Sequence, residues 1–440
     1  MISLFQVLFY KRKLLIKLGG GVAGGALACA LAHYRYFSKE DKKIILLDPS
    51  EPPSLSKFQD KNVIPDQRVV SLSLSSVNFL KEIGVWSLLN RDRIGVINQM
   101  QVWEIGGNSF IKFNDNPANE IGYVVETIHL QAALFERLKQ LENVKVEVPN
   151  KITDLRNEPG SFATVILNDE EKISARLVVG SDGTNSIVKK KSKIGSTGWS
   201  CLQQGIVCTV KTPYHNTTAW QRFLSTGPLA VLPLWDEYSS IVWSCENSLH
   251  SSLQQYSDED FLRELNYQLN RRPIYDTPNL ILNSNATFDL PPVITEICNK
   301  RRSFPLNMAQ ANQFVAPRVA LIGDAAHNIH PLAGQGLNLG LTDAAYLANN
   351  IVKNLRSGND IGNQDFLKEY EVASMNLNSS MMYGLEFIKR MYENNENSPS
   401  VFLRNIATAT INNATPIKSL FIDAANGKYS QPADYEWKRN

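Results

Sequence analysis

The chain has 440 residues, more than one hydrophobic core usually serves, and this length predicts about two or three domains. Hydrophobic residues make up 43% and charged residues 20%, a balance that excludes disordered, collagen-like and multi-span membrane proteins. The formal net charge of +2 gives no sign of a nucleic-acid-binding surface. Because the five cysteines form no CxxC pair, the sequence predicts neither a disulfide framework nor a metal site.

The chain opens with MISLFQVLFYKRKLLIK, a basic and apolar stretch without an acidic residue. This composition is compatible with part of a mitochondrial targeting segment. It is equally compatible with a frayed start that leads into a first strand. The sequence leaves both interpretations open.

The segment 14–32 allows two structures. Its only charge is Lys17, so it could form a single membrane-anchoring helix. The glycines clustered at its centre oppose this, since each costs a helix about 1 kcal/mol relative to alanine. The favoured alternative is a βαβ unit, with strands at 14–18 and 43–47, a tight turn at 19–24 and a helix at 25–33.

Within this unit, Gly19, Gly21 and Gly24 have the GxGxxG spacing, and Asp48 follows the second strand. Such glycines permit the tight turn, the approach of a pyrophosphate to the backbone, and close packing of helix on strand. The N–H groups at the helix start point at the phosphates, while the acid accepts hydrogen bonds from a ribose hydroxyl. The unit predicts dinucleotide binding without specifying the dinucleotide.

A second strand–turn–helix pattern reads RLVVGSDGTNSIVK. Its apolar strand at 177–179 leads to Asp182 and Gly183, and Ser186 is placed to cap the helix that follows. Taken alone, this pattern also fits a plain turn, because Asp-Gly is a common turn pair.

A third pattern reads PRVALIGDAAHNIHPLAGQGLNL. A strand at 319–322 leads to Gly323 and Asp324, and a glycine-rich turn containing Gly334 and Gly336 precedes a long helix from about Leu337. The density of turn residues argues against a merely structural loop.

Taken in order, these three motifs resemble the dinucleotide fold, the DG motif and the GD motif of the para-hydroxybenzoate-hydroxylase-type flavoprotein monooxygenases. Four segments resemble the ubiquinone-biosynthesis branch of that family: RVVSLSLSSVNFLKEIGVW, QVWE, AWQRFLSTGPLAVLPL and GDAAHNIHPLAGQGLNLGLTDA. The likeness spans residues 18–350. Two features depart from the family pattern: KRKLLIKLGGG replaces an apolar first strand, and Lys189 replaces a common arginine.

The resemblance implies FAD as the cofactor. In it, Arg68 would reach the pyrophosphate, Asp324 would accept from a ribityl hydroxyl, and residues 334–338 would present N–H groups to the flavin's pyrimidine edge. The complete set of implied cofactor residues is Gly19, Gly21, Gly24, Asp48, Arg68, Asp182, Gly183, Gly323, Asp324, Gly334, Gly336, Leu337 and Asn338.

The expected fold is α/β. We expect a Rossmann-like FAD-binding domain (1–95, 125–190 and 305–350) interleaved with a mixed β-sheet substrate domain (96–124 and 191–304), followed by a C-terminal helical region (351–440).

The composition of the later segments predicts further elements. Strands are expected at 205–210, 230–234 and 239–244, a helix at 251–275, and an amphipathic helix over 365–404. That last helix either closes the domain interface or docks on a membrane. Three tryptophans either line an aromatic pocket or, more commonly, pack in the core: Trp220, Trp235 and Trp243.

The implied reaction is aromatic hydroxylation. Reduced FAD would react with O₂ to give a C4a-hydroperoxide, which hydroxylates a 3-polyprenyl-4-hydroxybenzoate-type precursor at ring carbon 5. The chemistry is carried by the flavin, so no side chain is assigned as catalytic, and we interpret His327 and His330 as structural. An apolar channel is expected to start near Pro331 and Leu332 and to run between the FAD domain and the 200–305 sheet.

The resemblance further implies ferredoxin and ferredoxin reductase as electron donors, and other ubiquinone-biosynthesis enzymes as partners in a membrane-associated complex. It implies a peripheral location on the matrix side of the mitochondrial inner membrane. Two alternatives stay open at this point: a soluble NAD(P)H-dependent phenol hydroxylase, and a single-span membrane-anchored protein.

Overall fold

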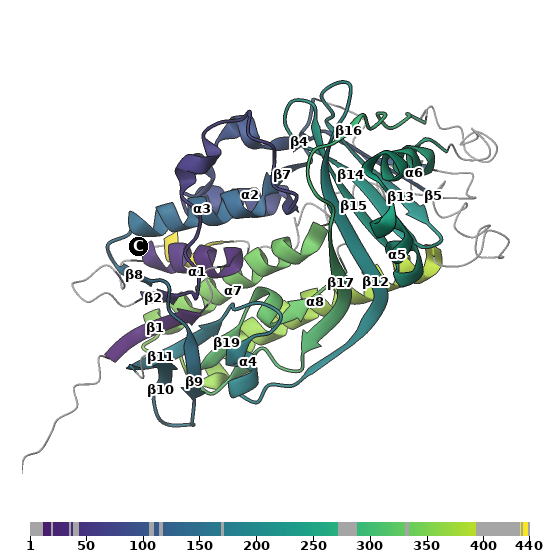
Figure 1. Ribbon diagram of the computed structural model, residues 1–440. Helices are drawn as coiled ribbons and strands as arrows, with labels where there is room; N and C mark the ends of the chain where they lie inside the picture. The colour runs from purple at the N-terminus through teal and green to yellow at the C-terminus, as the bar shows by residue number, and fades with distance from the viewer. Residues whose placement is uncertain are drawn as a thin grey trace, which may run out of the picture.

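The computed structural model describes residues 12–18, 21–34, 37, 44–104, 110–113, 118–168, 171–271, 288–330, 334–392, 432 and 434–438. Within this part of the chain, the strands form three β-sheets and the helices pack around and between them (Figure 1).

The first sheet has a parallel centre. Strand β1 pairs in parallel with both β11 and β2, which places Leu18 beside Gly180 and Leu47. The strand expected at 14–18 is therefore confirmed. The sheet runs in the order β18 (Val315–Ala316), β19 (Val319–Leu321), β11 (Lys172–Gly180), β1 (Arg12–Leu18), β2 (Ile44–Leu47) and β8 (Val144–Glu147), while β10 (Ala163–Leu167) pairs with β11 and with β9 (Ile152–Arg156).

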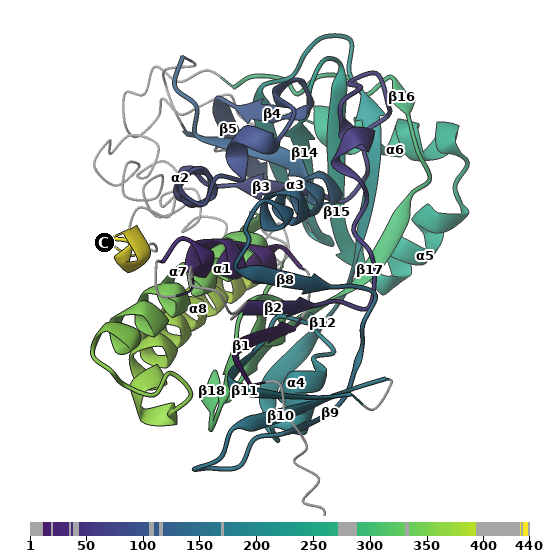
Figure 2. The same ribbon diagram turned by 90° about the vertical axis from the view of Figure 1, so that its left-hand side faces the viewer.

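Helix α1 (Val22–Ala32) crosses between β1 and β2 and packs between α3 (Thr127–Lys139) and α7 (Gln335–Arg356), as Figures 1 and 2 show. The helix begins three residues earlier than expected, so Gly24 lies inside it and not in the turn. Small residues permit this packing. A Cβ atom on Gly25 would lie 3.1 Å from the Cβ atom of Leu134 in α3.

The membrane-anchoring alternative for segment 14–32 is wrong, because a strand and a separate buried helix share the segment. The eleven residues of α1 give a rod of about 16 Å, well short of a bilayer core. No helix in the described ranges is both long and apolar enough to span a bilayer.

The second sheet is larger and mainly antiparallel. The strands expected at 205–210 and 239–244 are confirmed within longer strands, and the strand expected at 230–234 is confirmed up to Pro233, where β14 ends. Its order is β20 (His327–Asn328), β17 (Arg302–Ala311), β12 (Ser196–Lys211), β15 (Tyr238–Glu246), β14 (Gly227–Pro233), β13 (Thr218–Leu224), β5 (Gln99–Glu104) and β6 (Phe110–Phe113), with β16 (Glu296–Ile297) paired to β12.

The single helix expected at 251–275 is wrong, because two helices, α5 (Asn247–Gln255) and α6 (Asp258–Asn270), occupy this region. The chain is extended at Tyr256, and the side chain of Ser257 accepts a hydrogen bond from the N–H of Asp260 to cap α6. Trp220 and Trp243 are buried in the core of the second sheet, as the commoner interpretation predicted.

A third, small antiparallel sheet lies between the other elements. It consists of β3 (Val69–Leu72), β7 (Gly122–Glu126) and β4 (Gly95–Ile97), and all five residues of β7 are buried. The remaining helices are α2 (Leu74–Glu82) and α4 (Ile187–Lys191), and the short 3-10 helices are η2 (Leu55–Phe58), η3 (Trp86–Leu88), η4 (Arg91–Arg93), η5 (Gly323–Ala325) and η7 (Glu436–Lys438).

Helix α8 (Gln364–Tyr392) runs beside α7 and reaches from the first sheet to the second (Figure 1). Tyr370 is buried in the core of the first sheet, while Met382 packs against Leu306 and Met308 of β17. The amphipathic helix expected from residue 365 is thus confirmed up to residue 392, and it packs across the interface between the sheets. Its expected continuation to 404 lies outside the described residues.

The close approach of α1 and α3 generates a test. Replacing Gly25 by valine should lower the free energy of unfolding by about 1–3 kcal/mol, because the added atoms have no room beside Leu134. The same substitution at Gly384 in α8, where a Cβ atom would have no neighbour within 4 Å, is the matched control. Thermal unfolding of both variants makes the comparison, and equal stabilities would contradict the packing argument.

Candidate cofactor-binding site

The sequence motifs meet at one edge of the first sheet. Strands β19, β11, β1 and β2 are parallel neighbours, so their carboxyl ends lie together at the edge where nucleotide-binding sheets form their crevice. The predicted residues that follow these four strands are Gly21, Asp48, Asp182, Gly183, Gly323 and Asp324. Gly19, the remaining residue of the first turn, lies outside the described residues.

Two helices begin at this edge without a capping side chain. Gly21 is the N-cap of α1 and Gly334 the N-cap of α7, and neither first turn contains an acidic residue. Serine side chains cap α2, α4 and α6, while α3 and α5 also begin without a capping side chain. Backbone donors at an uncapped helix start suit phosphate or carbonyl oxygens.

The backbone conformation at position 334 favours glycine. Its φ is +61°, and a Cβ atom there would lie 3.1 Å from the Cβ atom of Ser71. The N-cap position of α7 therefore depends on glycine for both its conformation and its packing. Gly336 differs, because a Cβ atom there would make an ordinary contact of 3.7 Å with Ile329.

Asp48 is fixed directly after β2. Its Oδ1 atom accepts hydrogen bonds from the N–H of Ser50 at 2.9 Å and from the Ser50 hydroxyl at 2.8 Å. This local turn holds the carboxylate at the end of the strand, where the sequence predicts a ribose contact.

The carboxylate of Asp182 is directed toward its own chain. Oδ2 accepts from the N–H of Ile187 at 2.6 Å, and Oδ1 accepts from the hydroxyl of Ser186 at 2.6 Å. The cap expected from Ser186 is confirmed, since its hydroxyl accepts from the N–H of Lys189 at 3.0 Å. The side chain of Asp182 thus stabilises the turn, while Gly183, with φ of +80°, has open space where a Cβ atom would lie.

The GD turn depends on an acid that sequence analysis missed, Asp343 of α7. Its Oδ2 atom accepts from the N–H of Gly323 at 2.9 Å and lies 2.6 Å from Nε2 of His327. Asn378 of α8 donates to Oδ1 at 3.3 Å. Asp343 is almost fully buried, so these contacts satisfy a charge that water does not reach.

Asp324 lies in the GD turn itself and, unlike Asp343, is accessible to solvent. Desolvation by the protein around it raises the pKa of the Asp324 carboxyl, and the nearby His327 acts in the opposite direction. The accessible carboxyl is available to bind a hydroxyl group of a ligand at the strand edge.

The side chain of Asn338 holds the start of α7 in place. Its Oδ1 atom accepts from the N–H of Ser73 at 3.0 Å, and its Nδ2 atom donates to the carbonyl of Ser71 at 2.8 Å. These bonds join α7 to β3, which contains Ser71, and to Ser73, the N-cap of α2. The sequence predicted a role only for the backbone at this position, and not this role of the Asn338 amide.

Arg68 lies on an open cleft of about 730 Å³ beside α3. Its side chain is exposed, and its carbonyl accepts from the N–H of Thr127 at 2.9 Å. The charged residues that line the cleft are Glu51, Lys57, Arg68, Glu136 and Lys139. Three cationic side chains suit a phosphate-bearing ligand.

Residues 326–330, here called the GD loop, follow the GD turn and contact the second sheet. His330 is buried, and its Nε2 atom lies 3.2 Å from Oε1 of Gln203, whose Nε2 atom donates to the carbonyl of Thr226. Both histidines are buried and each contacts a side chain of another element, His327 that of Asp343 and His330 that of Gln203. Among the residues described, no group of three or more His, Cys, Asp or Glu side chains is placed to hold a metal ion.

Comparison with known proteins decides the family. The FAD binding domain family matches residues 59–377. Proteins named "Ubiquinone biosynthesis monooxygenase COQ6, mitochondrial" are similar along most of their length: that of Caenorhabditis elegans is 33% identical over 92% of this chain and 94% of its own, and that of Danio rerio 34% identical over 91% and 87%. The chain belongs to this family of FAD-dependent monooxygenases.

A solved structure confirms the monooxygenase fold. The p-nitrophenol 4-monooxygenase PnpA from Pseudomonas putida has a TM-score of 0.69 at 17% identity and covers 94% of this chain and 98% of its own. The uncapped starts of α1 and α7, the open space at Gly183 and the cleft that contains Arg68 fit FAD, the cofactor of this family.

Helix α3, which lines the cleft, also contains a buried histidine, His129. It stacks on Phe58 at 4.7 Å between ring centroids, and its Nε2 atom accepts from the N–H of Asn90 at 3.3 Å. Burial lowers the pKa of His129 to about 4, and the charge of Arg93 acts in the same direction.

This pKa predicts a dependence of stability on pH. Between about pH 6.5 and pH 4 the unfolded chain binds a proton at His129 that the folded protein does not, so acid favours unfolding. At pH 5 the loss should be about 2 kcal/mol relative to pH 7. His129→Gln, which keeps an acceptor for Asn90, should remove this part of the loss.

Urea unfolding at pH 7 and pH 5 measures the effect. His250→Gln, on the surface helix α5, is the control. If the His129→Gln protein loses as much stability in acid as the unchanged protein, His129 is not the source.

Proposed function

We propose that this FAD-dependent monooxygenase acts in ubiquinone biosynthesis and hydroxylates a 3-polyprenyl-4-hydroxybenzoate-type precursor at ring carbon 5. The observation that carries the proposal is the similarity, over most of the chain, to proteins whose names state that pathway and activity. The first alternative, a soluble NAD(P)H-dependent phenol hydroxylase, predicts a different response to substrate length.

FAD is proposed to lie along the edge of the first sheet. When bound, it supplies the activation of O₂ and the transfer of one oxygen atom to an electron-rich ring. The proposed residues are Gly19, Gly21, Gly24, Asp48, Arg68, Asp182, Gly183, Gly323, Asp324, Gly334, Gly336, Leu337 and Asn338. The proposed domain division assigns 305–350 to the FAD domain, although its boundary at residue 305 falls within β17 of the second sheet.

These residues have different tasks in the proposal. The start of α1 and Arg68 bind the pyrophosphate, Asp48 a ribose hydroxyl, and Asp324 a ribityl hydroxyl. The start of α7 directs backbone donors at the pyrimidine edge of the flavin. Asp182 and Asn338 act indirectly, because their side chains hold the turns that form the site.

The polyprenyl tail is proposed to bind between the GD loop, α8 and the second sheet. Two apolar clusters meet there at Ile329, which follows β20. The side chains that form them include Val102, Phe223, Leu306, Met308, Met382 and Leu385. Pro331 and Leu332, where the channel was expected to start, lie outside the described residues.

An apolar path suits such a tail because each buried CH₂ group contributes about 0.8 kcal/mol. Charged walls would oppose binding, since an unpaired charge loses its hydration there. Binding energy from the tail would then position the ring, which alone offers little surface.

The proposal extends to partners and location. Ferredoxin and ferredoxin reductase are proposed as electron donors, and other ubiquinone-biosynthesis enzymes as members of a membrane-associated complex. The proposed location is peripheral, on the matrix side of the mitochondrial inner membrane. The word "mitochondrial" in the names of the relatives supports the organelle.

The cofactor assignment is tested at the GD turn. Asp324→Ala removes the carboxyl proposed to bind a ribityl hydroxyl, a hydrogen bond of about 1.5–3 kcal/mol, so FAD affinity should fall about tenfold to hundredfold. Asp365→Ala, at the exposed start of α8, is the control. Flavin fluorescence titration measures both, and unchanged affinity in folded Asp324→Ala protein would refute the assignment.

The substrate class is tested by varying the tail. Turnover with ferredoxin and its reductase should rise steeply with the number of isoprene units, because the tail supplies most of the binding energy. Product analysis should locate the new hydroxyl at ring carbon 5. Efficient turnover of unprenylated 4-hydroxybenzoate with NADPH alone would favour the soluble phenol hydroxylase instead.

A further inference from the structure

We propose that the buried ion pair between Arg93 and Glu126 is a positioning device for the cofactor arginine, Arg68. The pair fixes residues 59–68, here called the strap, which join η2 to β3 and end at Arg68. This inference rests on the proposed role of Arg68 in binding the FAD pyrophosphate.

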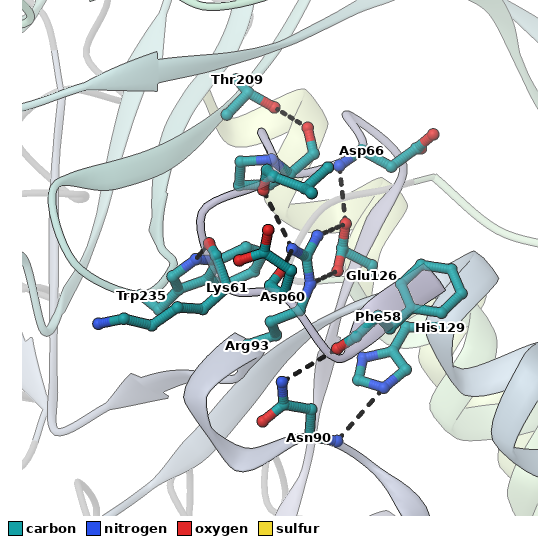
Figure 3. A network of polar contacts seen from close by, with 12 residues as sticks. Phe58, Asp60, Lys61, Asp66, Asn90, Arg93, Glu126, His129, Thr209 and Trp235 are labelled. Atoms are coloured by element: carbon teal, nitrogen blue, oxygen red, sulfur yellow. Dashed lines mark hydrogen bonds and ion pairs between the residues drawn. The ribbon is translucent and has the colours of Figure 1, made fainter. Parts of the chain in front are cut away.

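The pair itself is well formed and inaccessible to water. Arg93 ends η4, Glu126 ends β7, and both side chains are about 1% exposed. The guanidinium donates through Nε to Oε2 at 3.0 Å and through Nη2 to Oε1 at 2.8 Å, as Figure 3 shows. This two-point geometry fixes both the distance and the orientation of the groups.

Arg93 and Glu126 also form hydrogen bonds with the backbone of the strap. Nη1 of Arg93 donates to the carbonyls of Asp60 at 2.6 Å and Val63 at 3.0 Å. Oε1 of Glu126 accepts from the N–H of Asp66 at 2.8 Å. The pair therefore binds the strap at three backbone points, which Figure 3 shows converging on the guanidinium and the carboxylate.

The contacts continue from Glu126 to Arg68. Oδ1 of Asp66 accepts from the N–H of Arg68 at 2.8 Å and from its Nε at 3.3 Å. The residue after Glu126, Thr127, donates its N–H to the carbonyl of Arg68. Both the backbone and the side chain of Arg68 are thus held by groups that Glu126 and its neighbour position.

The second sheet holds the strap from the other side. Trp235 donates from Nε1 to the carbonyl of Lys61 at 2.9 Å, and its ring lies 4.5 Å from the guanidinium of Arg93. Thr209 of β12 donates its hydroxyl to the carbonyl of Pro65 at 3.1 Å. The strap is accordingly clamped between the second sheet and the Arg93–Glu126 pair (Figure 3).

Global stability is a poor explanation for such a pair. Removing two charges from water costs several kcal/mol, and well-packed apolar residues often replace a buried ion pair without loss. The start of the strap also has its own support, because Asn90 donates to the carbonyls of Phe58 and Gln59 at 3.0 Å each. What the pair specifically adds is the position of the strap from Asp60 to Asp66, the part that leads to Arg68.

The test is a double-mutant cycle on the full chain, with the FAD dissociation constant as the readout. Arg68→Gln should weaken FAD binding about tenfold, which corresponds to about 1.4 kcal/mol. Glu126→Gln should weaken FAD binding by a similar factor when Arg68 is present. In the Arg68→Gln background it should weaken FAD binding by less than about twofold, because the effects of two residues that act together do not add.

A second readout separates positioning from damage to the fold. If Arg68 leaves the phosphates, FAD affinity should depend less on salt in both Glu126→Gln and Arg68→Gln than in the unchanged protein. Arg93→Lys, which keeps the charge but loses the two-point geometry, serves as a second disruption of the pair should Glu126→Gln not fold. Arg91→Lys, two residues earlier on the surface of η4, is the matched control.

The outcomes distinguish the role of Arg68 in FAD binding from the role of the Arg93–Glu126 pair in positioning Arg68. If Arg68→Gln leaves FAD affinity unchanged, the proposed role of Arg68 fails. If Arg68→Gln weakens binding but Glu126→Gln has its full effect in both backgrounds, with unchanged salt dependence, the pair does not act through Arg68 and the inference is overturned.

Discussion

The parallel pairing of β1 with both β11 and β2 is the constraint on which the rest of the site depends. It brings turns from the beginning, the middle and the last third of the chain to one edge of one sheet. Parallel neighbours cannot be joined by a hairpin, so each pairing requires a crossover. Helix α1 supplies the first crossover, and its glycines and alanines let it lie close to both α3 and α7.

The sequence predicted the elements whose signal is local. The strands that precede the three glycine-containing motifs were predicted, because apolar runs and the turn residues that follow them are short-range patterns. The same reasoning placed the start of α1 too late, because tertiary packing overrides the poor helix propensity of Gly24 and Gly25. It also missed the break before α6, although Ser257 followed by three acids is a helix-start pattern.

The side-chain partners could not be predicted in the same way. Asp343 lies 20 residues along the chain from Gly323, whose N–H donates a hydrogen bond to it, and Arg93 lies 33 residues from Glu126. No spacing rule connects such pairs, since only the fold brings them together. In the candidate site, buried polar side chains such as those of Asp343 and Asn338 hold the turns in place, and these turns position exposed groups such as Asp324. Binding sites generally need such supporting residues behind the groups that contact the ligand.

Helix α8 has a mechanical consequence. Its 29 residues span about 43 Å, with Tyr370 embedded in the core of the first sheet and Met382 in contact with the second. A hinge that swung the two sheets apart would have to bend this rod or pull one of its ends out of a packed apolar cluster. Separating the two sheets would therefore expose apolar side chains that both sheets now bury against α8.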